Sequence, residues 1–429
     1  MRWLHASPLR HLGPGMLLAA TSIGSSHILM SPEAGARFGY SLLWLVVAAH
    51  LVKYPAFELA PRYVAARGES LLDAYARAPG PKNWAIWLGI ADMTAQGVGV
   101  IAALVGLTAT FVVEAFGVGG VASWSLALTA LLLLLLRFGH YAALRGINLA
   151  LLVLLSAGTL LAFSAAPPEP TAFASGLVPV LPDGSLFLIA AILGFMPTSV
   201  AVSVWQSLWA LEQGRFGDPS DAPEDRRRHL RRGLFDLRLG YGLSALLAVC
   251  FLSLGATLLA PRGLVPEGTE VALVLSRLYT LVLGDWMRPV VLAMAFAALF
   301  TTCYTLMDGL PRSFVAARHV LAGRPAHAAA DPHAEVDRLY WTFLLPVTFG
   351  GMAILALLPD PAFLVKAVAV LGLLLSPVYY ILNLWAVLRL VDDPALRPGR
   401  ASVALSIAGI VSLMFAAGLV LATSFGAGA

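Results

Sequence analysis

The sequence is poor in charged residues and in cysteine. Only 12% of its 429 residues are Asp, Glu, Lys or Arg, roughly half the share of an ordinary soluble protein, which excludes a soluble enzyme. Its two cysteines, Cys250 and Cys303, lie in apolar runs with no Cys or His at ligand spacing, so neither a disulfide framework nor a zinc site is expected. The GxSxG, GxxxxGK[ST] and HExxH motifs are missing as well. The sequence therefore predicts no hydrolase, no ATP coupling and no cofactor.

Long apolar stretches make up most of the chain. Hydrophobic residues form 59% of it and its mean hydropathy is +0.82, and each helix that crosses a bilayer needs ~20 mostly apolar residues. We therefore expect an all-α integral membrane protein surrounded by lipid, with no soluble domain. Hydropathy and the Gly, Pro and Arg positions predict eleven spans, which are Leu12–Phe38, Ser41–Ala65, Trp84–Thr108, Val121–Phe138, Ala142–Ala165, Leu186–Leu211, Gly233–Leu259, Trp286–Val315, Tyr340–Leu358, Phe363–Leu390 and Val403–Thr423.

Basic residues are distributed unevenly between the two sides of these spans. One side holds most of the arginines, including the run RRRHLRR at 226–232, whereas segment 166–185 on the other side holds no Lys or Arg. By the positive-inside rule the N-terminus is cytoplasmic, and eleven crossings of the plasma (inner) membrane place the C-terminus outside. The rule also accounts for the formal charge of +4, so nucleic acid is not an expected partner. We interpret the 226–232 run as a topological anchor in a cytoplasmic loop.

Two spans carry interruptions near mid-membrane. The first span contains TSIGSSH at 21–27, and the sixth contains GFMPTS at 194–199. Glycine and proline relax a helix, and the freed backbone groups must face protein, ion or water rather than lipid. Because five spans precede the sixth, the breaks occupy equivalent places in a five-plus-five arrangement, which is typical of secondary transporters. We expect one repeat at 1–165, a second at 166–392, and an eleventh span with the tail at 393–429.

The two breaks together predict the site of a small inorganic substrate ion. They offer hydroxyl groups, a histidine, and the N-termini of two half-helices that we expect to begin near His27 and Pro197. The candidate substrate-binding residues are Thr21, Ser22, Gly24, Ser25, Ser26, His27, Leu193, Gly194, Met196, Pro197, Thr198 and Ser199.

Three segments resemble a known family. GPGML at 13–17 and AGARFGYSLLW at 34–44 are similar to the opening of the Nramp transporters, and Met196-Pro197 is similar to the start of their sixth-helix motif. The resemblance implies the LeuT-type fold of the APC superfamily, with two inverted five-helix repeats and an eleventh helix. It also implies an ion site between the first and sixth helices, which in this family typically serves proton-coupled import of divalent metals such as manganese and iron.

The break residues depart from the family pattern. Gly24 stands where the family has its metal-binding aspartate, His27 stands at the asparagine, and Thr198 replaces the histidine that follows Met-Pro. Met196 remains, and a thioether is a soft ligand suited to transition metals. If a metal binds, Met196 and His27 are its candidate side-chain ligands, but the family's principal anionic ligand is missing.

The residues expected to couple proton flow are altered too. In the third span, Met93 and Gln96 stand at the family's acidic pair, and Asp92 lies one residue out of register. An ionisable group inside a span is by default a functional candidate, and a histidine changes charge near neutral pH. We therefore expect His27, Asp92 and Gln96 to form the coupling or proton-relay group.

Residue chemistry and family resemblance lead to different substrates. A divalent cation at mid-membrane needs carboxylate ligands, and the two breaks contain none. Hydroxyl groups and half-helix N-termini instead favour a small oxyanion such as bicarbonate. Backbone carbonyls, Met196 and neutral His27 could nonetheless hold a metal. A divalent cation of the manganese, iron or magnesium class and an oxyanion both stay open, with proton or sodium as the candidate co-transported ion.

Three more polar residues are expected at a gate or inner vestibule. Asp308 and Arg312 are four residues apart on the eighth span and can pair there. Gln206 follows the break of the sixth span by about two helical turns.

Overall fold

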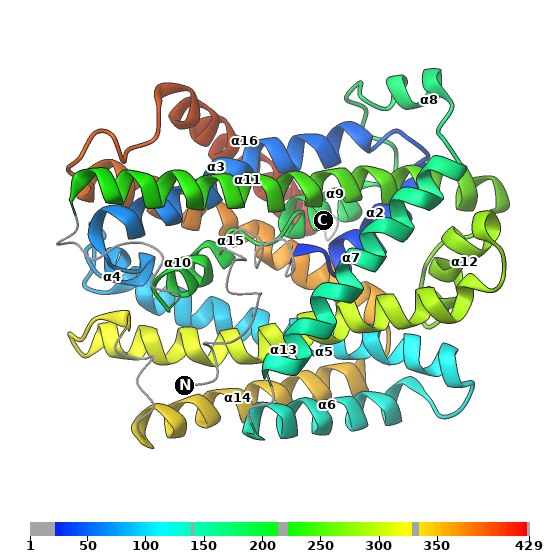
Figure 1. The fold of residues 1–429 in the computed structure, drawn as a ribbon, viewed down its shortest axis with the longest axis horizontal. Coiled ribbons are helices and arrows are strands. Elements are labelled where there is room, and N and C mark those ends of the chain that lie inside the picture. Colours follow the sequence, from blue (N-terminus) through cyan, green and yellow to red (C-terminus); the bar gives the residue numbers. More distant parts are fainter. Residues whose placement is uncertain (1–21, 139–140, 213–221, 328–333, 427–429) are drawn as a thin grey trace.

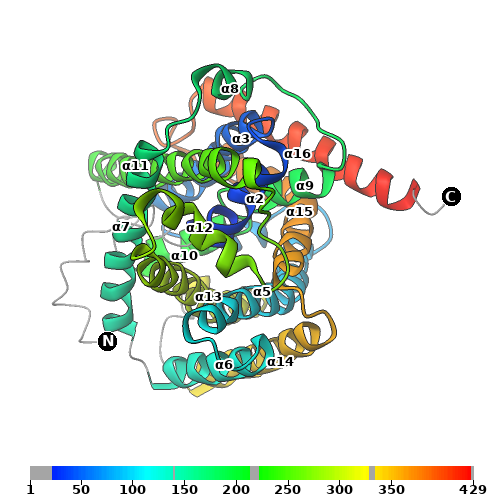
Figure 2. The same cartoon turned by 90° about the vertical axis from the view of Figure 1, so that its right-hand side faces the viewer.

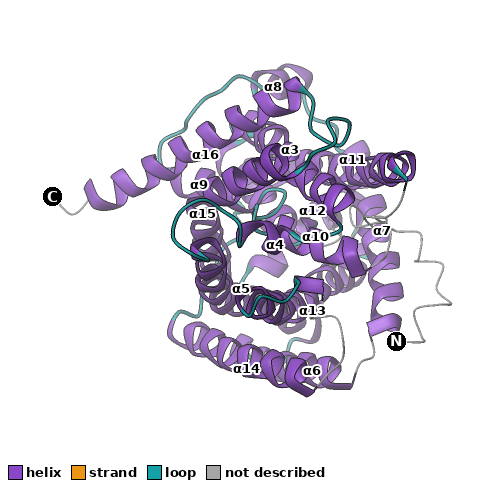
Figure 3. Ribbon diagram, turned by 90° about the vertical axis from the view of Figure 1, so that its left-hand side faces the viewer, coloured by secondary structure: helices purple, strands orange, loops and turns teal. Residues whose placement is uncertain are grey.

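The structure of the chain is a computed structural model that describes residues 22–138, 141–212, 222–327 and 334–426. All regular secondary structure in these ranges is helical (Figures 1 and 3). Helices are what the bilayer demands, because a helix satisfies its own backbone polar groups where no water is present. The predicted all-α class is confirmed.

The helices have the following bounds. The first half of the chain forms η3 (Ser26–Met30), α2 (Ser31–Phe38), α3 (Leu43–Arg67), α4 (Leu71–Tyr75), α5 (Trp84–Phe116), α6 (Val121–Phe138), α7 (Tyr141–Ala165), α8 (Pro170–Ser175), α9 (Leu186–Phe195) and α10 (Val202–Glu212). The second half forms α11 (Pro223–Leu254), η4 (Gly255–Leu259), η5 (Ala260–Arg262), α12 (Val271–Leu283), α13 (Met287–Leu321), α14 (Ala334–Leu357), α15 (Pro361–Leu390) and α16 (Arg400–Gly426).

Among the described residues, eight helices are long and apolar enough to cross a membrane. The predicted sixth span is divided into α9 and α10, and the predicted fifth span is α7, whose fully described part Val153–Ala165 is shorter than a crossing. The predicted first span falls partly on residues 1–21, outside the described residues. The count of eleven crossings and the repeat boundaries stay predictions.

The basic run at 226–232 belongs to a helix. The sequence suggests a loop there, but α11 begins at Pro223 and continues through the run. Proline is favoured at the first helical position, and Glu224 and Asp225 in the first turn suit the positive end of the helix dipole. The loop assignment is therefore wrong.

The helices form layers around a central group. In Figures 1 and 2, α5 and α13 lie between the pair α6 and α14 on one side and the broken-helix elements α2, α9 and α10 on the other. Helices α3 and α11 pack together beyond the broken elements, and α15 contacts both α5 and α9. This arrangement places the two interrupted spans inside the protein, where their exposed backbone groups can find partners.

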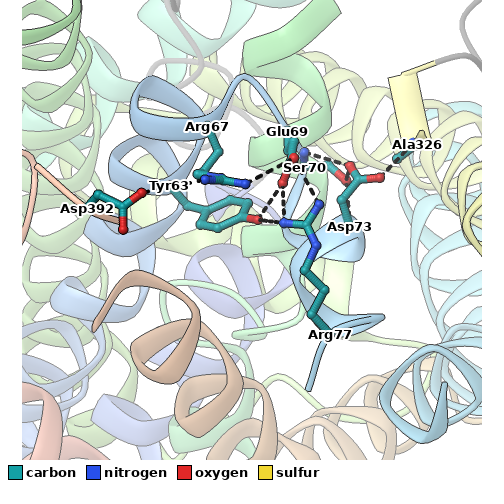
Figure 4. A network of polar contacts seen from close by, with 8 residues as sticks. All are labelled: Tyr63, Arg67, Glu69, Ser70, Asp73, Arg77, Ala326 and Asp392. Atoms are coloured by element: carbon teal, nitrogen blue, oxygen red, sulfur yellow. Dashed lines mark hydrogen bonds and ion pairs between the residues drawn. The ribbon is translucent and has the colours of Figure 1, made fainter. Parts of the chain in front are cut away.

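A polar network ties the α4 end of the bundle together (Figure 4). Arg77 donates to Glu69 at 2.6 Å, and Asp73 accepts from Ala326 N, beyond the end of α13, at 2.9 Å. Burial acts to raise the pKa of Glu69, but hydrogen bonds from Arg77 and Tyr63 outweigh it and hold that pKa below its usual range. These contacts join the end of α3 and α4 to the segment after α13.

Helices α2 and η4 approach to backbone contact at Gly35. A Cβ built on Gly35 would lie 2.0 Å from the carbonyl oxygen of Leu252 and 2.6 Å from the nitrogen of Ala256. Real Cβ atoms do not come this close to backbone, so the contact requires glycine. It fixes the second half of the broken first span against α11 and η4.

Replacing Gly35 by Ala should therefore destabilise the protein. The two helices would have to separate, at a cost of about 1–3 kcal/mol. Gly242→Ala in α11 is the matched control, because a Cβ at Gly242 has no neighbour within 4 Å. Heating the purified protein in detergent and measuring the monodisperse fraction should give a lower midpoint for Gly35→Ala alone. Equal midpoints for the two variants would contradict the close approach.

Candidate functional site

The first break lies at Ile23 and Gly24. The nitrogen of Gly24 donates to Ser22 O at 2.9 Å, and the nitrogen of His27 donates to Gly24 O at 3.1 Å. The chain then continues as η3 from Ser26. The half-helix expected to begin near His27 thus begins one residue earlier.

The second break is longer. Helix α9 ends at Phe195, Met196 is extended (φ −105°, ψ 122°), and α10 begins only at Val202. A residue that precedes proline is driven out of the helical region, so Pro197 extends the break and starts no helix. The prediction of a half-helix beginning near Pro197 is wrong, and the non-helical segment continues up to Val202.

The two breaks meet. Ser26 Oγ lies 3.4 Å from Pro197 O, and Ser31 Oγ lies 4.0 Å from Met196 Sδ. A cavity of about 110 Å³ lies beside them, several times the space that one water molecule needs. Its polar lining residues are Ser22, Ser25, Ser26, Tyr75, Asp92, Gln96, Thr198, Ser199, Trp205, Thr302, Ser313 and Tyr379.

The cavity separates the candidate site residues into two groups. Those that line it are Ser22, Ser25, Ser26, Pro197, Thr198, Ser199, Asp92 and Gln96. Those that do not line it are Gly24, His27, Leu193, Gly194 and Met196. Thr21 lies outside the described residues. Gly24 is close to the cavity, because a Cβ there would lie 3.1 Å from the lining residue Thr302.

His27 is fully buried and directed toward α11. Its Nε2 lies 2.9 Å from Ser244 Oγ, and its Nδ1 lies 2.9 Å from Ser26 Oγ. Ser244 Oγ in turn lies 3.4 Å from Nε2 of His50, a residue that the sequence analysis left out. Both ring nitrogens of His27 thus already have partners.

Asp92 on α5 lines the cavity, and its carboxylate accepts hydrogen bonds from two side chains. Its Oδ1 accepts from Gln96 Nε2 at 2.5 Å, and its Oδ2 accepts from the Tyr379 hydroxyl of α15 at 2.7 Å. Asp92 is the one carboxylate among the described lining residues. The spacing of four residues signals the contact with Gln96, whereas no local pattern reveals Tyr379.

Lys53 on α3 is the site residue that the sequence patterns miss. Its side chain is completely buried, and Nζ donates to the carbonyl oxygens of Leu193 (3.0 Å), Gly194 (2.9 Å) and Thr198 (2.6 Å). Leu193 and Gly194 lie in the last turn of α9, and Thr198 lies in the unwound segment after it. A lysine at the middle of a predicted span is the signal that could have found it.

The expected gate residues are found on two helices. Arg312 Nε lies 2.7 Å from Asp308 Oδ2, as the spacing predicts, and Asp308 also accepts from the Tyr340 hydroxyl at 3.0 Å. Gln206 is buried on α10 and does not line the cavity. Its Oε1 has no hydrogen-bond partner among the described residues.

At the opposite end of the bundle, near α12, buried charges join α2 to α15. Lys366 Nζ lies 2.7 Å from Glu33 Oε1, and the same oxygen accepts from Arg37 at 2.9 Å. Arg37 also pairs with Glu267 at 2.5 Å. Glu33 and Arg37 are four residues apart and could be paired from the sequence, but the cross-helix contact with Lys366 could not.

Metal ligands do not gather in the described part of the chain. No group of three or more His, Cys, Asp or Glu residues there could hold a metal ion. Met196 and His27, the two candidate ligands, are both fully buried and have partners in Ser31 and in Ser26 and Ser244. A metal substrate would have to use hydroxyl groups, backbone carbonyls and Asp92.

Comparisons with known proteins agree on the family. The family model "natural resistance-associated macrophage protein-like" (Nramp) matches residues 15–425. An uncharacterized protein of Pasteurella multocida is 28% identical over 73% of this chain and 71% of its own length. The divalent metal cation transporter MntH of Chromohalobacter salexigens is 30% identical over 58% of this chain and 57% of its own length.

Solved structures show the same fold. A mutant form of the manganese transporter of Eremococcus coleocola superposes with a TM-score of 0.69 at 15% identity, covering 97% of this chain and 86% of that one. The nucleobase-cation-symport-1 transporter Mhp1 gives 0.59 at 16% identity, covering 95% and 91%. The chain therefore belongs to the Nramp family and is a multi-pass membrane transporter with the LeuT-type fold, not an enzyme.

Proposed function

We propose that this protein is a secondary-active transporter of a small inorganic ion that binds in the cavity between the two helix breaks. One observation carries this: Ser26, which begins η3 directly after the first break, contacts Pro197 of the second break, and both line the same cavity. Broken helices that meet at mid-membrane are the usual substrate site of inverted-repeat transporters. We further propose that the inverted repeats are 1–165 and 166–392.

For the substrate, the chemistry of the cavity favours a small oxyanion such as bicarbonate. The lining offers several hydroxyl donors, and both oxygens of its one described carboxylate, Asp92, are held by Gln96 and Tyr379. Residues 1–32 and 186–211 contain no Asp or Glu. The buried Lys53 side chain beside the second break adds positive charge when its amine is protonated. A divalent cation loses its hydration in such a place without carboxylate compensation.

Family membership favours a second candidate, a divalent metal cation. The similar proteins named above as MntH and manganese transporter support this class. Backbone carbonyls and hydroxyl groups together with Asp92 would then supply the ligands.

The α4 end of the bundle is proposed to face the cytoplasm. Arg227 of the basic run pairs with Asp393, and Arg67 at the end of α3 pairs with Asp392, so both cations lie at the same end. The positive-inside rule places this end on the cytoplasmic side of the inner membrane.

Uptake into proteoliposomes separates the two substrates. We expect labelled bicarbonate to accumulate when a proton or sodium gradient is imposed, and manganese and magnesium not to. Empty liposomes serve as the control. Uptake of manganese but not of bicarbonate would overturn the proposal of an oxyanion substrate and support a divalent metal cation instead.

Gly24→Asp tests the charge that the site accepts. A carboxylate at this position would repel an anion at ~4 Å by several kcal/mol in a partly buried site and stop its uptake, whereas it would give a metal the hard ligand it lacks and tighten binding. Gly24→Asn is the matched control, because it adds the same bulk against Thr302 without charge. Bicarbonate uptake and calorimetric titration with manganese are measured on both variants. Tighter manganese binding to Gly24→Asp alone would contradict the oxyanion.

Asp92→Asn tests proton coupling. Asp92 is the one carboxylate in the described cavity lining, so we expect its removal to abolish the response of uptake to an imposed proton gradient while some gradient-independent exchange persists. His27→Gln alters a histidine outside the lining, and it is measured alone and combined with Asp92→Asn. If uptake by the combined variant still responds to the proton gradient, neither residue takes part in coupling.

A further inference from the structure

The second break leaves carbonyl groups of α9 without helical partners. The last carbonyls of a helix accept no intrahelical hydrogen bond, and they carry the negative end of the helix dipole. In transporters with broken helices, such carbonyls commonly coordinate a cation. Leu193 and Gly194 lie in the last turn of α9, and Thr198 lies in the unwound segment that follows it.

In this protein the side-chain amine of Lys53 lies at the position that such a cation would take. Nζ of Lys53 lies 2.6 to 3.0 Å from the oxygens of Leu193, Gly194 and Thr198. An ammonium has three N–H donors, and three acceptors receive them. The group is fully buried, so the match replaces the water shell of the ammonium.

The geometry of these carbonyls is fixed by packing. A Cβ on Gly194 would lie 1.8 Å from Ala369 O of α15, so α9 and α15 touch backbone to backbone at this point. The carbonyl of Gly194 therefore cannot turn away from Lys53 without moving α9 relative to α15.

The charge of Lys53 has no acidic partner in the described structure. Among the described residues no carboxylate forms an ion pair with it, and Glu58 on the same helix pairs with Arg62 instead. Carbonyl dipoles alone compensate a buried charge incompletely. The Thr198 carbonyl accepts a hydrogen bond from Lys53 Nζ, and Thr198 also lines the cavity. An anion bound in the cavity therefore lies close to the uncompensated charge.

We propose that Lys53 is the built-in cation of the second break and a specificity-determining residue of the site. Its ammonium occupies the carbonyl ligands that a free cation would use, and its charge selects a small anionic substrate. The second statement rests on the proposed oxyanion function. The first does not, since it concerns the ligands of the break alone.

Lys53→Ala tests both statements with separate readouts. The variant frees three carbonyls and a space that a small cation can enter, so methylammonium should raise its unfolding midpoint and leave the midpoint of the wild type unchanged. Its bicarbonate uptake should fall by about tenfold or more, equivalent to ~1.4 kcal/mol or more, and methylammonium should restore part of it. Lys82→Ala, at an exposed lysine in the loop before α5, changes the net charge equally and should show neither effect.

Each outcome decides one statement. If methylammonium does not raise the unfolding midpoint of Lys53→Ala, the proposal that Lys53 is the built-in cation is overturned. Wild-type bicarbonate uptake that persists undiminished in the variant overturns the role in specificity. A wild type that takes up manganese and no bicarbonate defeats the oxyanion function, while the stability readout still tests the built-in cation.

If Lys53→Ala does not fold, two other variants replace it. Lys53→Gln keeps N–H donors toward the carbonyls without the charge, so it should fold and lose bicarbonate uptake. Lys53→Arg keeps the charge and should retain part of the uptake. Full uptake by Lys53→Gln overturns the proposal.

Discussion

Every carbonyl that leaves a helix inside a bilayer must find a partner, and this requirement shapes the centre of the protein. The break after α9 is satisfied by one buried ammonium, that of Lys53. Unsatisfied backbone groups in hydrocarbon cost several kcal/mol each, so the Lys53 side chain from α3 stabilises the unwound segment, and α15 packs closely against α9 at Gly194. Thr198, one of the three acceptors, also lines the cavity, so this contact borders the candidate site.

Local patterns in the sequence predict the helices and the breaks well. Apolar length gives the spans, the glycine at 24 and the Met196-Pro197 pair give the interruptions, and a spacing of four gives Asp308 with Arg312. The pattern misleads at Pro197, because proline is common both at helix starts and in unwound segments. The pattern also misleads at 226–232. A run of basic residues suggests a loop, but charged residues can extend a helix beyond the membrane, as they do in α11.

The contacts that define the candidate site are different in kind. Lys53 meets residues about 140 positions away, and Tyr379 meets Asp92 across 287 positions. No periodicity or motif within one helix carries such information, because it depends on how α3, α9, α5 and α15 pack. His27 shows the same limit: the sequence marks it as a candidate ligand, whereas packing turns it toward Ser244.

The buried pair of Glu33 and Lys366 near α12 has a consequence for helix movement during transport. Glu33 is 1% exposed, and its Oε2 has no hydrogen-bond partner among the described residues. Any movement that draws α2 away from α15 must part these charges. Glu33 then keeps Arg37 of its own helix, whereas Lys366 loses its carboxylate partner in a dry interior. Separation therefore costs less once water reaches the Lys366 ammonium. Access of water to this one group lowers the barrier to opening on that side.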